Sequence, residues 1–148
     1  MSHPISHQIL NRLLTILYRS LPMYLTYATP WVHRGEAKAT EALKHIAADQ
    51  QQMAQRIGQY ILEHHGPIEM GEYPVDFLDM HDLALDYLLS RLVECQKRDL
   101  ADIEVCAGQL KHERQAAALA EEALGAARGY LESLEELSAQ VTTSSWSR

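Results

Sequence analysis

Apolar residues recur at intervals of three and four along four long segments of the chain, and this spacing constrains the fold more than any other feature. Residues three and four positions apart lie on one face of an α-helix, so each segment predicts an amphipathic helix with one apolar stripe. In the first segment the stripe comprises Ile9, Leu10, Leu13, Leu14, Leu17, Leu21, Tyr24, Leu25 and Ala28. The segments are rich in Leu and Ala, which favour helices over strands. The sequence therefore predicts an all-α fold with almost no β-structure.

At 148 residues the chain has the size of one ordinary domain, and we expect a single domain over residues 1–148. Its predicted helices cover approximately residues 7–29, 37–64, 76–107 and 113–140, followed by a frayed tail over residues 141–148. A segment rich in Gly and Pro, from His65 to Pro74, is the longest connection. Two helix pairs on either side of one longer crossover predict an antiparallel four-helix bundle of the ferritin-like kind.

Pro22 interrupts the apolar stripe of the first predicted helix. Because proline lacks the backbone donor and its ring clashes with the preceding turn, we expect the helix axis to bend between Tyr18 and Pro22. The same helix should end near Thr29 and Pro30, since the residue before a proline avoids the helical conformation.

The chain carries a net charge of -7 and has a pI of about 5.5, without a basic patch. An acidic surface repels phosphate backbones, so nucleic acid is not an expected partner. Residues Met1 to Gln8 contain no Lys, no Arg and no long apolar stretch, and we expect a cytoplasmic location without membrane attachment. Cys95 and Cys106 lie about three turns apart on one predicted helix, so they cannot pair and fit a reducing compartment.

The order and spacing of several short motifs suggest a family. These motifs are Leu10-Asn11-x-Leu13-Leu14, Trp31-x-x-Arg34-Gly35, Ala54-x-Arg56-Ile57, Gly66, Tyr73-Pro74-Val75-Asp76 and the stretch from Asp82 to Arg91. Over roughly residues 8 to 138 the chain resembles the Dps proteins, the mini-ferritins of starved bacteria. This resemblance implies a hollow homo-oligomer that oxidises ferrous iron between two subunits, using His near the first helix and carboxylates on the second.

The chain departs from the family at the positions of those iron ligands. The two histidines of the family fall on Pro30 and near Thr40, and its two carboxylates fall on Gln51 and Gln55. Iron centres require hard oxygen and imidazole ligands, and none of these four positions retains the His or carboxylate that the family has there. The resemblance therefore predicts the fold of the family without its intersubunit ferroxidase site.

Other ferritin-like proteins hold an iron pair inside the bundle, with one Glu from each of two helices and Glu-x-x-His from each of the other two. No Glu-x-x-His motif occurs in the chain. Alignment on bacterioferritin-like landmarks gives the matching positions as Leu17, Gln50, Met53, Cys95, Leu124 and Ala127. We therefore expect no conventional di-iron centre, no catalytic residue and no bound cofactor.

A relocated metal site is the alternative. His45 and Asp49 are four residues apart on the second predicted helix and share one face, and His33 could approach them from a neighbouring subunit. The simpler interpretation is a solvated histidine beside a carboxylate. Gln50, Cys95 and Asp99 fall on inner faces, and we interpret them as a buried hydrogen-bond network with Tyr18, Arg19 or Tyr27 as donors.

Two further polar clusters have local interpretations. His64 and His65 end the second predicted helix, where they can interact with the terminal carbonyl groups. An acidic row at helical spacing complements the N-terminus of the third predicted helix, or alternatively forms an access path for cations. The row consists of Asp76, Asp79, Asp82 and Asp86.

The leading functional hypothesis is a Dps-like oligomeric protein that has lost its di-iron centre and has a structural or partner-binding role. The alternative is an iron-binding oxidoreductase or iron-storage protein of the Dps type with a relocated site. Homo-oligomerisation has a physical motive, because apolar residues of the first segment lie outside its main stripe and would face water. These residues are Ile16, Met23, Trp31 and Val32. A dimer through the first two helices, or a closed shell, would cover them.

Overall fold

The computed structural model describes residues 4–28, 37–82 and 84–146, and within these residues the chain is helical and contains no β-strand. The all-α prediction is therefore confirmed. In chain order the elements are α1 (Pro4–Tyr18), α2 (Leu21–Met23), the π-helix η1 (Tyr24–Ala28), α3 (Ala37–Glu63), the 3-10 helix η2 (Val75–Asp82), α4 (Leu85–Gln109) and α5 (Arg114–Trp146).

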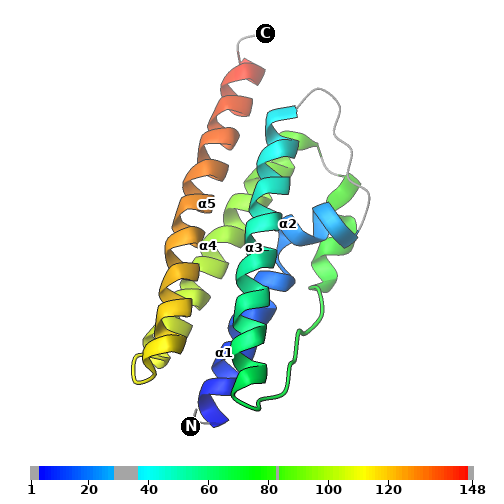
Figure 1. Ribbon diagram of the computed structural model, residues 1–148. Helices are drawn as coiled ribbons and strands as arrows, with labels where there is room; N and C mark the ends of the chain where they lie inside the picture. The colour runs from blue at the N-terminus through cyan, green and yellow to red at the C-terminus, as the bar shows by residue number, and fades with distance from the viewer. Residues whose placement is uncertain (1–3, 29–36, 83, 147–148) are drawn as a thin grey trace.

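The four long helices, α1, α3, α4 and α5, lie side by side around one apolar core (Figure 1). The predicted stripe of the first segment faces this core, and Leu10, Leu13, Leu14 and Leu17 are fully buried there. Burying one leucine contributes roughly 1.5–3 kcal/mol relative to leaving it in water. Within the described residues, none of the helices combines the length and hydrophobicity that crossing a bilayer requires.

The first predicted helix is broken near Pro22. Helix α1 ends at Tyr18, and Ser20 caps α2 in an extended conformation while its Oγ accepts a hydrogen bond from the Met23 amide at 3.3 Å. Pro22 then occupies the first turn of α2, where its missing N–H costs no hydrogen bond. The predicted bend is confirmed, and α2 leaves the axis of α1 (Figure 1). The predicted end at Thr29 and Pro30 lies outside the described residues.

Asn11 holds the connection after α3 against α1. Its side-chain Nδ2 donates to the Pro67 carbonyl at 2.8 Å, and its Oδ1 accepts from the Glu69 amide at 2.8 Å. One residue past the end of α1, Arg19 Nε donates to the Gly71 carbonyl at 3.0 Å. The connection therefore follows α1 and satisfies part of its own backbone with α1 side chains.

Some predicted boundaries are wrong. The segment predicted as one helix over 76–107 is divided into η2 and α4, and Ala84 between them is extended at ψ 149°. In η2 the buried Phe77 and Met80 are three residues apart, which is the repeat of a 3-10 helix. Helix α5 continues to Trp146, because neither Gly nor Pro follows Gln140 to end it. The tail predicted to fray is helical to that residue.

The expectation that Ile16 and Met23 face water is also wrong. Met23 is 4% exposed, and Ile16 packs against the core. Trp31 and Val32 lie outside the described residues. The break at Pro22 explains the position of Met23, because α2 leaves the axis of α1 there. Ile16 lies before the break, and it shares a cavity wall with Phe77 of η2.

Replacing Gly71 with alanine should lower the free energy of unfolding by about 1–2 kcal/mol. Gly71 has φ +68°, and a Cβ there would lie 2.6 Å from Thr15 Cγ2, so both the backbone and the contact with α1 resist the change. Urea denaturation followed by circular dichroism measures the effect.

Gly108→Ala is the matched control, because a Cβ on this α4 residue meets no atom of the described chain within 4 Å. It should raise the free energy of unfolding by about 0.5–1 kcal/mol. Equal effects at the two glycines would contradict the close fit of the connection to α1.

Candidate functional site

Six positions are predicted from the resemblance to correspond to iron ligands of ferritin-like bundles, and all six lie in the core. All six are buried, and they are Leu17, Gln50, Met53, Cys95, Leu124 and Ala127. Across the described residues, no three His, Cys, Asp or Glu side chains gather closely enough to hold a metal ion. The interior of the described bundle is therefore built from apolar and neutral side chains at these positions.

Gln50 is 3% exposed and has its own partner. Ser20 Oγ donates to Gln50 Oε1 at 2.7 Å, so the residue that caps α2 also ties α3 to the break after α1. Cys95 and Asp99, grouped with Gln50 in the sequence-based prediction, line a cavity to which Gln50 does not belong. Arg19, proposed as a donor to this group, donates to Gly71.

Gln96 is a second buried amide, which the sequence analysis did not identify. It is 2% exposed, its Nε2 donates to the Ala127 carbonyl at 3.1 Å, and its Oε1 has no partner within the described residues. The available signal was its spacing, because Gln96 lies seven residues from both Leu89 and Ile103, which are buried on α4. Gln96 links α4 to α5.

The candidate metal ligands on α3 have different surroundings. The hydroxyl of Tyr130 on α5 donates a short hydrogen bond to Asp49 Oδ2, and burial followed by this bond raises the pKa of Tyr130. His45 is exposed beside a shallow groove between α3 and α5. His33 lies outside the described residues. In the described chain Asp49 is thus paired with a tyrosine.

The predicted role of His64 agrees with the structure. Its Nδ1 lies 2.8 Å from the Tyr60 carbonyl oxygen at the end of α3, and the two rings stack at 4.0 Å. His65 follows with φ 61°, a left-handed conformation that ends the helix.

The acidic row is divided between two helices. Asp76 stands in the first turn of η2, and Asp86 stands in the first turn of α4, where its Oδ1 accepts from the Tyr87 amide at 2.9 Å. The side chains of Asp79 and Asp82 lie outside the described part. The prediction that one helix N-terminus accounts for the whole row is wrong, because the chain is extended at Ala84.

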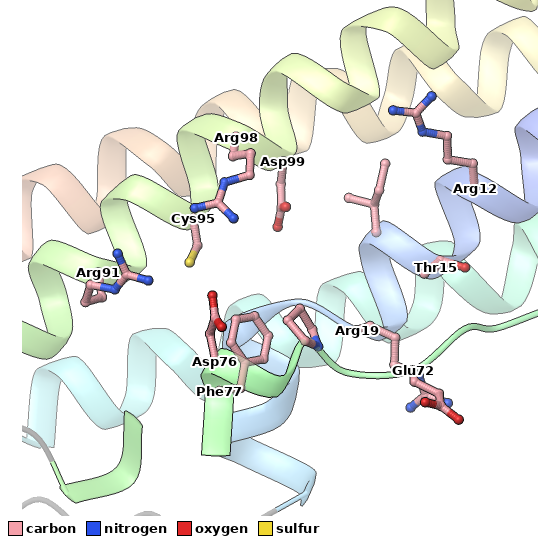
Figure 2. Close-up of a pocket in the computed structure, with 12 residues that line it drawn as sticks. Arg12, Thr15, Arg19, Glu72, Asp76, Phe77, Arg91, Cys95, Arg98 and Asp99 are labelled. Atoms are coloured by element: carbon pink, nitrogen blue, oxygen red, sulfur yellow. The ribbon is translucent and has the colours of Figure 1, made fainter. Parts of the chain in front are cut away.

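A cavity of about 360 Å³ lies where α1, the end of the connection with η2, and α4 meet (Figure 2). This volume is at the lower end of the range found for small-molecule sites. Apolar side chains of Ile16, Pro74 and Phe77 form part of its wall, together with Thr15 and Cys95. Seven ionisable side chains complete the lining, and they are Arg12, Arg19, Glu72, Asp76, Arg91, Arg98 and Asp99.

The arginines follow a regular spacing along two segments. Arg12 on α1 and Arg19, one residue past its end, are seven residues apart, and Arg91 and Arg98 are seven residues apart on α4. Residues seven apart lie on the same face of a helix two turns from each other. This shared spacing was the sequence signal for the cavity, but the contact between the two faces is visible only in the structure.

Asp99 and Cys95 point from α4 toward Asp76 and Phe77 (Figure 2). Burial raises the pKa of the Asp99 carboxyl to about 7, with a further increase from Asp102 and an opposing effect of Arg98. Burial and then the charge of Asp99 raise the pKa of the Cys95 thiol, so it remains protonated at neutral pH. A protonated thiol is a poor nucleophile, and Cys95 therefore does not have the character of a catalytic cysteine.

No protein-family model matches the chain, and no curated protein matches its sequence.

Replacing Ser20 with alanine should lower the free energy of unfolding by about 1–3 kcal/mol, because Gln50 Oε1 loses its buried donor. In the double variant Ser20→Ala with Gln50→Leu both polar partners are absent. Urea denaturation of the unaltered protein, the two single variants Ser20→Ala and Gln50→Leu, and the double variant should give a coupling energy of about 1 kcal/mol between the two side chains. Strictly additive effects would show that the two side chains do not depend on each other.

Asp99→Asn should stabilise the protein in a pH-dependent way. The pKa of Asp99 rises from an ordinary value of 3.8 to about 7 on folding, so the ionised carboxyl destabilises the fold increasingly as the pH rises between these values. The substitution should therefore raise the free energy of unfolding by about 2 kcal/mol at pH ~8 and very little at pH ~4. Chemical denaturation at a series of pH values measures this difference.

Glu104→Gln, an exposed position on the same helix, is the control. It should change the free energy of unfolding by less than about 0.5 kcal/mol at either pH. A pH-independent effect of Asp99→Asn would contradict the raised pKa.

Proposed function

We propose that this chain is a ferritin-like protein of the Dps kind that lacks the conventional di-iron centre and serves as an oligomeric structural or partner-binding protein. One observation carries this proposal. The buried core positions that match ferritin-like iron ligands hold Leu17, Gln50, Met53, Cys95, Leu124 and Ala127. No carboxylate or imidazole is available at these positions to balance the charge of iron, and an unbalanced ion is costly in a protein interior.

The directions of the helices support the ferritin-like part of the proposal. In Figure 1, α1 and α5 run one way along the bundle, whereas α3 and α4 run the opposite way. The long connection after α3 returns the chain along α1 before α4 begins. Two helix pairs joined by a single long crossover are the arrangement of ferritin-like bundles.

The oligomeric part of the proposal needs exposed apolar side chains, and the described residues include such side chains on η1 and on α3. Tyr27 in η1 is 54% exposed, and Leu62 near the end of α3 is 62% exposed. A two-fold contact between copies would remove such residues from water. Tyr27 and Leu62, in place of Ile16 and Met23, are thus the exposed apolar side chains whose burial would favour assembly.

An iron-handling protein of the Dps type with a relocated site is the second candidate. It is favoured by His45 and Asp49, which stand one turn apart on α3, with the Tyr130 hydroxyl bound to the carboxylate. These two side chains are fewer than the three protein ligands that a typical catalytic metal site uses. His33 of another copy would have to supply the third.

Elemental analysis after aerobic incubation with ferrous iron tests the choice between the two candidates. We expect iron well below one per subunit and no acceleration of ferrous oxidation, because the six matched core positions carry no carboxylate or imidazole to hold the ion. Light scattering of the same sample should give the mass of a dimer or a larger assembly.

Stoichiometric iron with oxidation, abolished in His45→Ala and Asp49→Asn variants, would establish the relocated site instead. Unaltered iron uptake in these variants, or a monomeric mass, would each contradict one part of the proposals. Lys44→Gln, on an exposed neighbouring position of α3, is the matched control for the His45 and Asp49 variants.

A further inference from the structure

The cavity between α1, η2 and α4 has a well-supported wall. The Phe77 ring packs against Tyr24 at 5.7 Å, and Tyr24 packs edge to face against Tyr73 at 5.2 Å. The Arg19 guanidinium lies 4.9 Å from the centre of the Tyr73 ring while its Nε is bound to the Gly71 carbonyl. Aromatic packing and a fixed arginine therefore hold η2 and the connection in place against α1.

The guanidinium groups of α4 have weak partners. Arg91 contacts Glu94, a residue outside the cavity lining, in a surface pair at 2.7 Å. Such exposed pairs contribute about 0–1 kcal/mol and exchange easily for another anion. Arg98 makes no hydrogen bond or ion pair within the described part of the chain, although its charge acts on Asp99 and Cys95. Two guanidiniums on one helix face are thus available to an incoming oxyanion.

Carboxyl groups of the cavity do not form a cation site. Glu72 and Asp76 are exposed, and Asp99 is flanked on its own helix by Cys95 and Arg98. No group of three metal-ligating side chains occurs here among the described residues. Cations would also meet four arginine side chains, so the charge distribution favours an anion.

Asp99 can assist an anion when it carries its proton. Besides Asp99, the charged and titratable groups of the cavity lining are Arg12 on α1, Arg19 just after α1, Glu72 and Asp76 on the connection and η2, and Arg91, Cys95 and Arg98 on α4. Asp102 on α4 also acts on the Asp99 carboxyl. A protonated carboxyl donates a hydrogen bond to an oxyanion, whereas an ionised carboxyl repels it.

From these contacts we infer that the cavity binds a small organic anion, with a carboxylate or phosphate group at Arg91 and Arg98 and a compact apolar body against Ile16, Pro74 and Phe77. The size of the cavity is compatible with either a carboxylate or a phosphate group on the ligand. Its apolar wall favours a ligand whose apolar part is small and either flat or branched. This site is independent of the iron chemistry and the assembly discussed above.

Titration of the full-length, isotope-labelled protein with benzoate and with phenyl phosphate, followed by amide NMR, tests the inference. We expect at least one of the two anions to shift resonances of residues near Thr15, Phe77 and Cys95 in a saturable way. Binding of benzoate, which stays ionised over this range, should be tighter at pH ~6 than at pH ~8, since Asp99 gains its proton there. Benzamide and benzamidine share the ring but lack the negative charge, and neither should bind at this site.

Substitution of the two α4 arginines separates specific binding from general charge effects. The double variant Arg91→Gln with Arg98→Gln should weaken binding of the effective anion by about tenfold or more. Arg128→Gln with Arg114→Gln, two exposed positions on α5, removes the same charge elsewhere and should leave the affinity unchanged. Asp99→Asn should abolish the pH dependence of benzoate binding, because asparagine does not titrate and benzoate keeps its charge in this range.

The outcome also identifies the head group. Saturable shifts with benzoate alone, phenyl phosphate alone or both would support a carboxylate site, a phosphate site or a common oxyanion site. Absence of shifts with both anions, equal binding of benzamidine, or equal weakening by the α4 and α5 double variants would each overturn the inference.

Discussion

The side-chain amide of Asn11 is the interaction on which the arrangement of this protein depends. One carboxamide donates to the Pro67 carbonyl and accepts from the Glu69 amide, so a single α1 residue satisfies the backbone of the connection at two points. Arg19 continues the attachment at Gly71, where a glycine is needed because its φ is positive and Thr15 lies close. These contacts hold the connection along α1. As a result η2 lies before the start of α4, where its residues form part of the cavity wall.

The interior of the bundle is mainly apolar, in contrast to the hydrogen-bonded contact between α1 and the connection. Two buried hydrogen bonds link elements there: Ser20, the cap of α2, donates to Gln50 on α3, and Gln96 on α4 donates to the Ala127 carbonyl on α5. These neutral hydrogen bonds stabilise the packing without introducing charge into the core. An interior of this kind suits a scaffold more than a redox centre, and it is the reason for proposing that the ferritin-like architecture has been kept while the conventional iron chemistry has been lost.

Ionisable groups that could do chemistry lie instead at the edge of the bundle. Helix α4 presents a core face containing Leu88 and Leu92 and a second face on which Arg91, Arg98 and Asp99 meet the cavity. The raised pKa of Asp99 follows from its position between these two environments, because it is largely removed from water while its own helix supplies Asp102 as well as Arg98. A carboxyl that changes its charge near neutral pH, beside two arginines, is the basis on which we infer that the cavity binds a small anion.

The sequence by itself determined the features that depend on neighbours along the chain. Helical spacing predicted the long helices, Pro22 predicted the break after Tyr18, and the terminal position of His64 predicted its contact with a helix carbonyl. Tertiary structure decided the rest: η2 separates from α4 because Phe77 packs against Tyr24 and Tyr73, and Asp49 pairs with Tyr130 across two helices. The cavity likewise unites arginine pairs from helices far apart in sequence. Periodicity specifies which face of a helix is apolar, but the partner of each polar face depends on how the helices pack, which no local pattern encodes.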